Sequence, residues 1–230
     1  MNKWHEIWNS RGSNEKLEYD LNALINLDGF DSGAGKVSVS DWLENARNVT
    51  DLLNIKDGDS VFEVGCGCGA FLKGLQEIRN IKIGGIDYSN SLIKVANLVF
   101  PNQDFNYGEA KDIKGIEDYD YVLAHGVFHY FDLNYAENVI KKMLLKAQKI
   151  VCILDIPDLS TMEESEKMRR ESLTIDDYKK KYEGLEHTYF EKSWFEILIN
   201  KLGYKCEFIE GLMPNYAQKS FRFGIIIKKK

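Results

Sequence analysis

The sequence predicts an α/β fold in which a mostly parallel β-sheet is covered by helices on both faces. From about residue 60 onward, short runs rich in β-branched and aromatic residues alternate with segments whose apolar residues recur at helical spacing. Strands and helices that alternate in this way form parallel sheets with crossover helices. A glycine-rich turn joins the first such strand to the first such helix, as at the ligand-binding edge of an open α/β sheet. The 230 residues suffice for one substantial core.

Seven segments are predicted to be strands, because apolar, β-branched and aromatic residues fill them and turn residues bound them. These segments are residues 61–64, 81–87, 105–107, 119–124, 150–154, 204–209 and 221–227. The connection between the last two is too short for a crossover helix. We therefore expect these two strands to pair as an antiparallel hairpin.

Helices are predicted between these strands from apolar residues that recur every three or four positions. The inward-facing sets are Phe71, Leu72, Leu75 and Ile78; Leu92, Val95, Ala96 and Val99; Ala136, Val139, Ile140, Met143 and Ala147; and Trp194, Phe195, Leu198, Ile199 and Leu202. Pro101 is expected to stop the second helix and Gly203 to cap the last one. Pro157 is expected to end the fifth strand.

An N-terminal helical segment, residues 1–56, precedes the alternating pattern and is expected to act as a cap or lid. Within it, a helix over residues 41–53 is predicted to begin at Ser40 or Asp41. Its inward-facing residues are Trp42, Ala46, Val49 and Leu53.

A second departure from the alternation lies inside the α/β domain, which we place at residues 57–230. Residues 158–190 are rich in charge and contain little that could form a central strand. We expect them to form a helical lid inserted into that domain.

The stretch VFEVGCGCGAF raises the question of what its two cysteines do. The glycines at positions 65, 67 and 69 allow the backbone to turn sharply and to approach a ligand more closely than a Cβ would permit. Cys66 and Cys68 are small enough to fill the positions between them. A closed zinc site needs about four ligands, and the other cysteines, Cys152 and Cys206, each lie alone in apolar runs. We therefore predict free thiols and no metal.

The spacing of the glycine turn differs from the G-x-G-x-x-G of a dinucleotide-binding loop. An acidic residue, Glu63, stands two positions before the first glycine, and Asp87 ends the next strand about twenty residues downstream. A carboxylate at the end of that strand can accept both hydroxyls of a ribose. This pair of features favours a ligand of nucleoside type.

Four successive motifs together resemble those of the class I S-adenosylmethionine-dependent methyltransferases: EVGCGCGAF, GIDYS, YGEAKDI and YDYVLAHGVFHYF. The resemblance is strong over residues 58–156 and looser toward the C-terminus. It implies a Rossmann-like, three-layer α/β/α fold around a seven-stranded sheet whose last strand is antiparallel. It also implies S-adenosylmethionine as the cofactor.

The resemblance further implies which residues contact the cofactor. Those positions are Glu63, Gly65, Cys66, Gly67, Asp87, Tyr88, Glu109, Ala110 and His125. By this likeness the glycine turn lines the methionine part and Glu63 organises it, Asp87 holds the ribose hydroxyls, Tyr88 lies against the adenine, and Glu109 and Ala110 meet its edge. A histidine at position 125 departs from the small polar residue that is more usual there.

Methyl transfer to a hydroxyl is helped by a general base, for which histidine is suited near neutral pH. The candidates are His125 and His129, which flank the exit of the fourth strand, and His187, which lies where the family often builds its acceptor pocket. Packing roles for these histidines stay open. Trp4, Trp8, Tyr19 and Phe30 of the N-terminal segment are candidates for part of an aromatic wall around the methyl group, although ordinary packing of a helix on the core is slightly favoured for each tryptophan.

The glycine-containing stretch at residues 28–38 resembles a phosphate loop only superficially. Val37 occupies the position of the magnesium-binding Ser or Thr, and the glycine spacing is one residue too long. We interpret the stretch as a flexible loop, and the hypothesis that it folds over cofactor or substrate stays open. Asp155 and Asp158, which follow the fifth strand, are candidates for the acceptor side or for turn formation.

The leading hypothesis is a methyltransferase that acts on a small molecule, with an oxygen acceptor favoured over nitrogen. A cofactor-binding protein without catalysis and an NAD-dependent oxidoreductase stay open as alternatives. The net charge of −6 argues against nucleic acid as the main partner. No signal peptide or membrane-spanning run is visible, so we expect a cytoplasmic protein that has no membrane partner. No motif bears on the oligomeric state.

Overall fold

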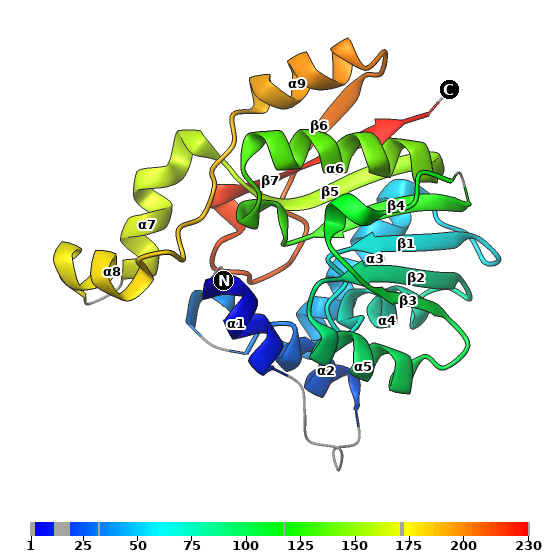
Figure 1. Cartoon of the computed structure of the whole chain (residues 1–230), viewed down its shortest axis with the longest axis horizontal. Coiled ribbons are helices and arrows are strands. Elements are labelled where there is room, and N and C mark those ends of the chain that lie inside the picture. Colours follow the sequence, from blue (N-terminus) through cyan, green and yellow to red (C-terminus); the bar gives the residue numbers. More distant parts are fainter. Residues whose placement is uncertain (1–2, 12–18, 32, 117, 171–172, 230) are drawn as a thin grey trace.

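The computed structural model describes residues 3–11, 19–31, 33–116, 118–170 and 173–229. At its centre is a seven-stranded sheet with the order β3-β2-β1-β4-β5-β7-β6 (Figure 1). The strands are β1 (Ser60–Val64), β2 (Lys82–Asp87), β3 (Asp104–Tyr107), β4 (Tyr119–His125), β5 (Ala147–Pro157), β6 (Cys206–Glu210) and β7 (Arg222–Lys228). Only β7 runs antiparallel to its neighbours, β5 and β6. The predicted Rossmann-like α/β fold is confirmed.

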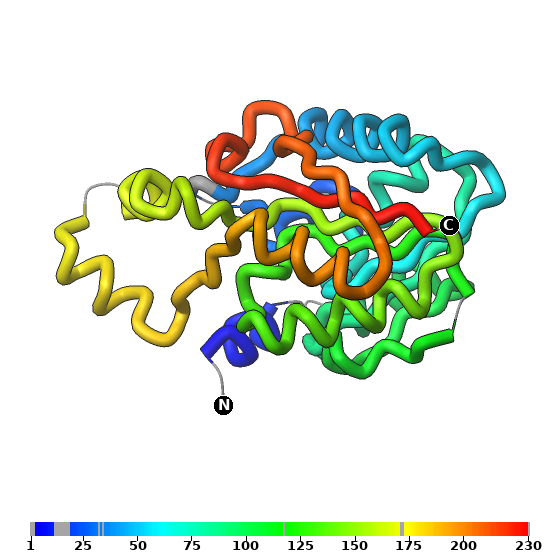
Figure 2. Tube along the Cα trace, turned by 90° about the horizontal axis from the view of Figure 1, so that it is seen from above, coloured from blue at the N-terminus to red at the C-terminus, as the bar shows by residue number. Residues whose placement is uncertain are grey.

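Helices cover both faces of the sheet and complete three layers (Figure 2). One face carries α2 (Leu21–Leu27), α3 (Val39–Leu53), α4 (Ala70–Gln76) and α5 (Asn90–Val99), and the other carries α6 (Leu133–Lys146) and α9 (Lys192–Lys201). Because side chains alternate along a strand, a strand in the middle of the sheet contributes to both cores. In β1, Val61 packs with the first group of helices and Phe62 with the second.

Short 3-10 turns connect these elements around the strand ends. They are η1 (Gly33–Gly35), η2 (Ala110–Asp112), η3 (Phe128–Tyr130), η4 (Leu159–Thr161) and η5 (Lys219–Phe221).

Two predicted boundaries were wrong by a few residues. The helix of the N-terminal segment is capped by Ser38, whose hydroxyl accepts the backbone N–H of Asp41 at 3.1 Å, and not by Ser40 or Asp41. Ala147 was expected on the inner face of α6, but its extended backbone begins β5. β5 is longer than predicted because it pairs with β4 along one edge and with β7 along the other, as far as Pro157.

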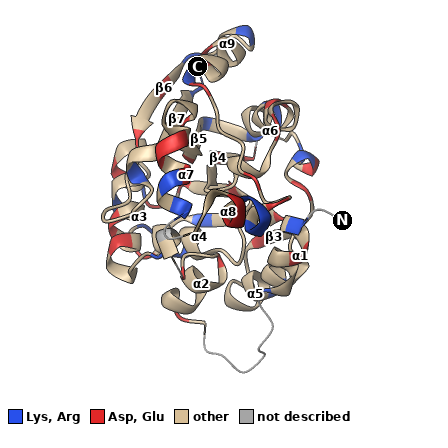
Figure 3. Ribbon diagram, turned by 90° about the vertical axis from the view of Figure 1, so that its left-hand side faces the viewer, with Lys and Arg blue, Asp and Glu red and all other residues tan. Residues whose placement is uncertain are grey.

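Three further helices lie beyond the carboxyl ends of the parallel strands: α1 (Lys3–Ser10), α7 (Met162–Arg170) and α8 (Ile175–Tyr182). Seen from that side, α7 and α8 stand in front of the sheet and contain both acidic and basic residues (Figure 3). The Lys3 ammonium donates to the backbone carbonyl of Glu183 at 2.6 Å, so α1 meets the turn after α8. The insertion at 158–190 contains the helices α7 and α8, and its action as a lid stays a prediction.

The N-terminal segment is packed onto the rest of the chain. α2 and α3 belong to the same core as α4 and α5, and the buried indole of Trp42 donates to the carbonyl of Ala70 at 3.1 Å. The division at residue 56 stays a prediction. Within the described ranges, no helix combines the length and apolar character that a membrane-spanning segment needs.

Candidate functional site

A cavity of about 430 Å³ opens where the parallel strands end, and α1 forms part of its wall. Every residue predicted from the sequence to bind the cofactor or to take part in catalysis lines it: Glu63, Gly65, Cys66, Gly67, Asp87, Tyr88, Glu109, Ala110, His125, His129 and His187. These residues come from stretches far apart in the chain, and the sheet topology brings them together. The role of each stays a prediction.

The glycine turn after β1 forms one end of this cavity. The φ angles of the turn are positive: 71° at Gly65, 53° at Gly67 and 87° at Gly69. Residues other than glycine rarely adopt such angles. A Cβ at Gly65 would lie 2.5 Å from the side chain of Val127, and a Cβ at Gly67 would collide with the carboxylate of Asp28. Both positions therefore require glycine for space as well as for conformation.

The two cysteines within the turn serve as packing groups. A Cβ at Gly85 would lie 2.6 Å from the sulfur of Cys66, so this side chain sits directly on β2. Cys68 is fully buried beneath Leu24. Burial raises the pKa of both thiols well above the usual range, which keeps them protonated. Among the described residues, no group of three or more His, Cys, Asp or Glu side chains could hold a metal ion.

Asp28, from the turn after α2, caps the start of α4 from a distance in sequence. Its Oδ1 accepts the backbone N–H of Cys68 at 2.8 Å, and its Oδ2 accepts that of Ala70 at 3.1 Å. These are N–H groups that the short helix α4 leaves without partners of its own. Burial raises the pKa of Asp28 to about 7 despite these bonds. Sequence reasoning placed residues 28–38 near the ligand but did not assign Asp28 a contact.

Asp87, at the end of β2, braces the glycine turn from the other side. Its Oδ1 accepts the backbone N–H of Ser89 at 2.7 Å, and its Oδ2 accepts that of Gly67 at 3.0 Å. Burial raises its pKa to about 6. The carboxylate is thereby fixed at the cavity wall, with lone pairs to spare for a ligand.

Glu63 is the third buried carboxyl group at this end. It is 3% exposed, and its Oε2 has no hydrogen-bond partner in the described part of the chain. Burial, together with the negative charges of Asp28 and Asp87, raises its pKa well above the usual range. Three buried acids that repel one another form a site suited to a cationic ligand.

Beyond Asp87, the cavity is closed by α1. The hydroxyl of Tyr88 donates to the carbonyl of Trp4 at 3.4 Å. The ring of His5 lies edge-on to Tyr88 at 4.3 Å, and its Nε2 is 3.3 Å from the carboxylate of Glu109. Tyr135 donates to the same carboxylate at 3.0 Å. The predicted adenine-binding residues thus lie under a helical cover, and His5 is a contact that the sequence did not reveal.

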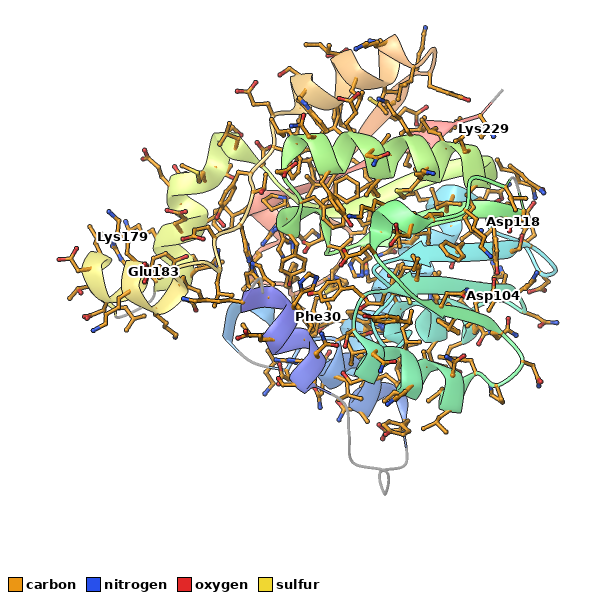
Figure 4. All side chains as sticks on the ribbon, in the orientation of Figure 1. Phe30, Asp104, Asp118, Lys179, Glu183 and Lys229 are labelled. Atoms are coloured by element: carbon orange, nitrogen blue, oxygen red, sulfur yellow. The ribbon has the colours of Figure 1, made fainter. Side chains whose placement is uncertain are left out.

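His125 is packed into an aromatic cluster. Its ring stacks on Phe30 at 5.9 Å and lies 4.5 Å from Phe71 and 5.6 Å from Trp42. Burial lowers its pKa to about 4, so it is neutral near pH 7. Phe30 lies in the interior beside α1, whereas Lys179 and Glu183 lie at the outer end of the lid (Figure 4).

Of the aromatic residues predicted to wall the site, Trp4, Trp8 and Phe30 line the cavity. Tyr19 packs against the core of the α2–α5 face instead.

His129 and His187 meet at the other end of the cavity. Their ring centroids are 4.2 Å apart, and the carbonyl of His129 accepts the N–H of Thr188 at 2.9 Å, which joins the turn after β4 to the last part of the 158–190 insertion. Neither Nδ1 has a hydrogen-bond partner among the described residues. Burial, reinforced by the charges of Arg169 and Arg222, lowers both pKa values well below the usual range. Both rings are therefore neutral near pH 7, and the same burial and charges make them weaker bases than a free imidazole.

The two aspartates after β5 separate in the structure. Asp155 lines the cavity with a left-handed φ of 59°. Asp158 accepts from Ser160 and pairs with Lys192 at 3.0 Å, as a turn residue outside the cavity lining. Asp155 faces Arg222, a cavity residue that the sequence analysis missed. The signal was an arginine at the start of an otherwise apolar strand.

Comparison with known sequences identifies part of the chain. Residues 62–151 match the model of a methyltransferase domain family. A putative methyltransferase of Invertebrate iridescent virus 6 is 28% identical over 81 residues, a match that spans 35% of this chain and 31% of the viral protein. An uncharacterized methyltransferase of Staphylococcus carnosus is 27% identical over 177 residues, or 74% of this chain and 81% of that protein.

The fold is also found among solved structures. Magnesium protoporphyrin IX methyltransferase from Synechocystis PCC 6803, crystallised with S-adenosylhomocysteine, superposes with a TM-score of 0.60 at 14% sequence identity. The match covers 86% of this chain and 89% of that one.

Proposed function

We propose that the chain is an S-adenosylmethionine-dependent methyltransferase that methylates a small molecule, with an oxygen acceptor favoured over nitrogen. One observation carries the proposal. Acidic and glycine residues at one end of a single cavity adjoin neutral imidazoles at the other, so both halves of the reaction have side chains suited to them. A volume of about 430 Å³ suits a small ligand. The solved relative named for magnesium protoporphyrin IX is consistent with such an acceptor.

The residues present fit S-adenosylmethionine. The unpaired Oε2 of Glu63 and the acids on either side of it favour a ligand with positive charge. The glycine turn leaves room for a close backbone approach. Asp87 would hold the ribose hydroxyls, and Tyr88 and Glu109 would meet the adenine beneath α1.

The cofactor supplies a methyl group that its sulfonium already activates. The chain has then to orient the acceptor in line with that group and to keep bulk water away. Trp4, Trp8 and Phe30 provide the apolar cover, and aromatic faces also favour a nearby cation.

A hydroxyl acceptor must lose a proton during transfer. His129 and His187 are neutral, carry an Nδ1 that no described residue occupies, and lie away from the acidic end of the cavity. Either imidazole can take that proton as a general base. This availability is why we favour oxygen over nitrogen.

Calorimetry separates this proposal from its alternatives. S-adenosylmethionine and S-adenosylhomocysteine should bind in roughly the micromolar range, and NAD should produce no heat. Single-turnover transfer from labelled S-adenosylmethionine to a panel of hydroxylated and amine metabolites should then yield methylated product. A protein that binds the cofactor but methylates none of the panel would refute the small-molecule proposal. Preference for amines would refute the choice of oxygen.

A further inference from the structure

Arg222 is the first residue of β7 and lines the catalytic cavity with a side chain that is only 2% exposed. It pairs across the sheet with Pro157, the last residue of β5. Because β7 is antiparallel, its amino end lies at the edge where the parallel strands have their carboxyl ends. The reversed strand therefore delivers a guanidinium into the site.

Most of this guanidinium has no hydrogen-bond partner. Only Nη2 is engaged, by the side-chain oxygen of Gln218. Nε and Nη1 have no partner among the described residues. The nearest carboxylate oxygen, Oδ1 of Asp155, lies 3.9 Å from Nε, which is too far for a hydrogen bond. Gln218 uses one of the two hydrogens on Nη2, so one edge of the guanidinium keeps two parallel donors.

Burial of unpaired donors on a charged group is costly, and in native sites a protein group, an ordered water or a bound ligand satisfies them. Asp155 is a weak candidate because it hydrogen-bonds to the hydroxyl of Tyr216 and is separated from Nε. Arg222 therefore has both charge and geometry available to a molecule in the cavity.

The two ends of the cavity differ in charge. Asp28, Glu63 and Asp87 make the cofactor end acidic. At the opposite end, Arg222 is the only lysine or arginine among the described residues of the lining, and the two neighbouring histidines are neutral. Asp155, 3.9 Å from Nε, offsets part of its charge but leaves its donors free. A planar carboxylate can take two parallel N–H bonds from one guanidinium edge, which is the geometry that these donors offer.

We propose that the methyl acceptor is an organic acid whose carboxylate is bound by Arg222. This inference rests on the proposed function, because it places the acceptor in the same cavity as the cofactor. Gln218 orients the guanidinium, and the carboxylate holds the acceptor beside His129 and His187.

The test uses matched acid and amide pairs. Protein saturated with S-adenosylhomocysteine is titrated with a series of aromatic carboxylates, from benzoate to larger ring systems, and with the corresponding amides. We expect the acids to bind about ten- to a hundredfold tighter than their amides, the range for charge-assisted hydrogen bonds. Equal binding of acids and amides across the series, or no binding of any acid, would overturn the proposal.

Single substitutions test whether Arg222 causes the preference for acids over amides. Arg222→Met should abolish it, and Arg222→Lys should retain part of it, because the charge remains without the planar fork. Arg47→Met, at an exposed position of α3, should leave it unchanged. An acid preference that survives in Arg222→Met would also overturn the assignment. If the methionine variant does not fold, an acid preference in Arg222→Lys as large as in the wild type would overturn it instead.

Binding of S-adenosylhomocysteine is measured on every preparation. If folded wild-type protein does not bind it, the proposed function fails. If it binds and the acids show no preference, only the carboxylate assignment fails. With an identified acceptor, Arg222→Lys should raise the acceptor KM and leave the cofactor KM unchanged.

Discussion

Cofactor binding should release protons, because the acids around the glycine turn are protonated more readily than free carboxyl groups. Burial raises the pKa of Asp28 to about 7 and that of Asp87 to about 6. A cation beside them favours the ionised forms and lowers both pKa values. The affinity for S-adenosylmethionine should therefore increase as the pH rises.

The magnitude follows from these two values. With a pKa of about 7, Asp28 is protonated in roughly nine tenths of molecules at pH 6 and in roughly one tenth at pH 8. Its ionisation alone gives about a tenfold rise in affinity over that interval, and Asp87 adds about twofold. Glu63, whose pKa is also raised, increases the effect.

The assay is calorimetry at pH 6, 7 and 8, in two buffers whose ionisation enthalpies differ. The apparent binding enthalpy should depend on the buffer in proportion to the protons released. S-adenosylhomocysteine, which lacks the sulfonium charge, should release fewer protons. An affinity that is constant from pH 6 to 8, with no buffer dependence, would refute the reasoning.

A substitution tests whether the buried acids Asp28, Glu63 and Asp87 cause the pH dependence of the affinity. Asp28→Asn should flatten most of the pH dependence, while Asp51→Asn, at an exposed position of α3, should preserve it. The stability of the unliganded protein should change with pH in the opposite direction to its affinity for the cofactor. Because the folded state holds the proton on Asp28 more tightly than the unfolded state, the unliganded protein should lose stability as the pH rises from about 4 to about 7, and then level off.

Three further predictions concern single positions. Asp87→Ala should weaken S-adenosylhomocysteine binding about tenfold or more, since a charged acceptor of hydrogen bonds is lost; unchanged affinity in calorimetry would remove the ribose assignment. Gly67→Ala should cost about 1–3 kcal/mol more in thermal unfolding than Gly58→Ala, because both have positive φ but only the methyl at position 67 meets a buried carboxylate; equal losses would contradict this. His129→Asn should lower kcat at least about tenfold with unaltered cofactor affinity. Since the pKa of His129 is lowered well below the usual range, wild-type kcat should stay flat above neutral pH, and a rise in kcat through pH 7 to 8 would argue against this base.

The seven strands and the glycine-turn end of the site were largely predictable. A strand, a tight glycine turn and a helix are adjacent in sequence, so residues such as Gly65 reveal their surroundings through local pattern alone. Asp87 follows from the same logic, because parallel strands place their carboxyl ends at one edge of the sheet. The errors at Ser38 and Ala147 were of a few residues, at element ends where capping and tertiary pairing decide.

The acceptor end was only partly predictable. His129 and His187 were named as candidates. Their contact across 58 positions depends on the path that the 158–190 insertion takes back to the turn after β4. Asp28 accepts a hydrogen bond from Cys68, 40 residues away in sequence. His5, which lies in α1, contacts Glu109. Such contacts leave no period or spacing in the sequence.

The sequence by itself determined the α/β architecture, the glycine turn and the carboxylate of the second strand, because hydrophobic periodicity and backbone requirements act between near neighbours. Only the tertiary structure decided that three acids share one end of the cavity and that Arg222 occupies the other. Charge interactions depend on distance and burial in space, and both are set when the reversed last strand and the N-terminal helices close around the strand ends.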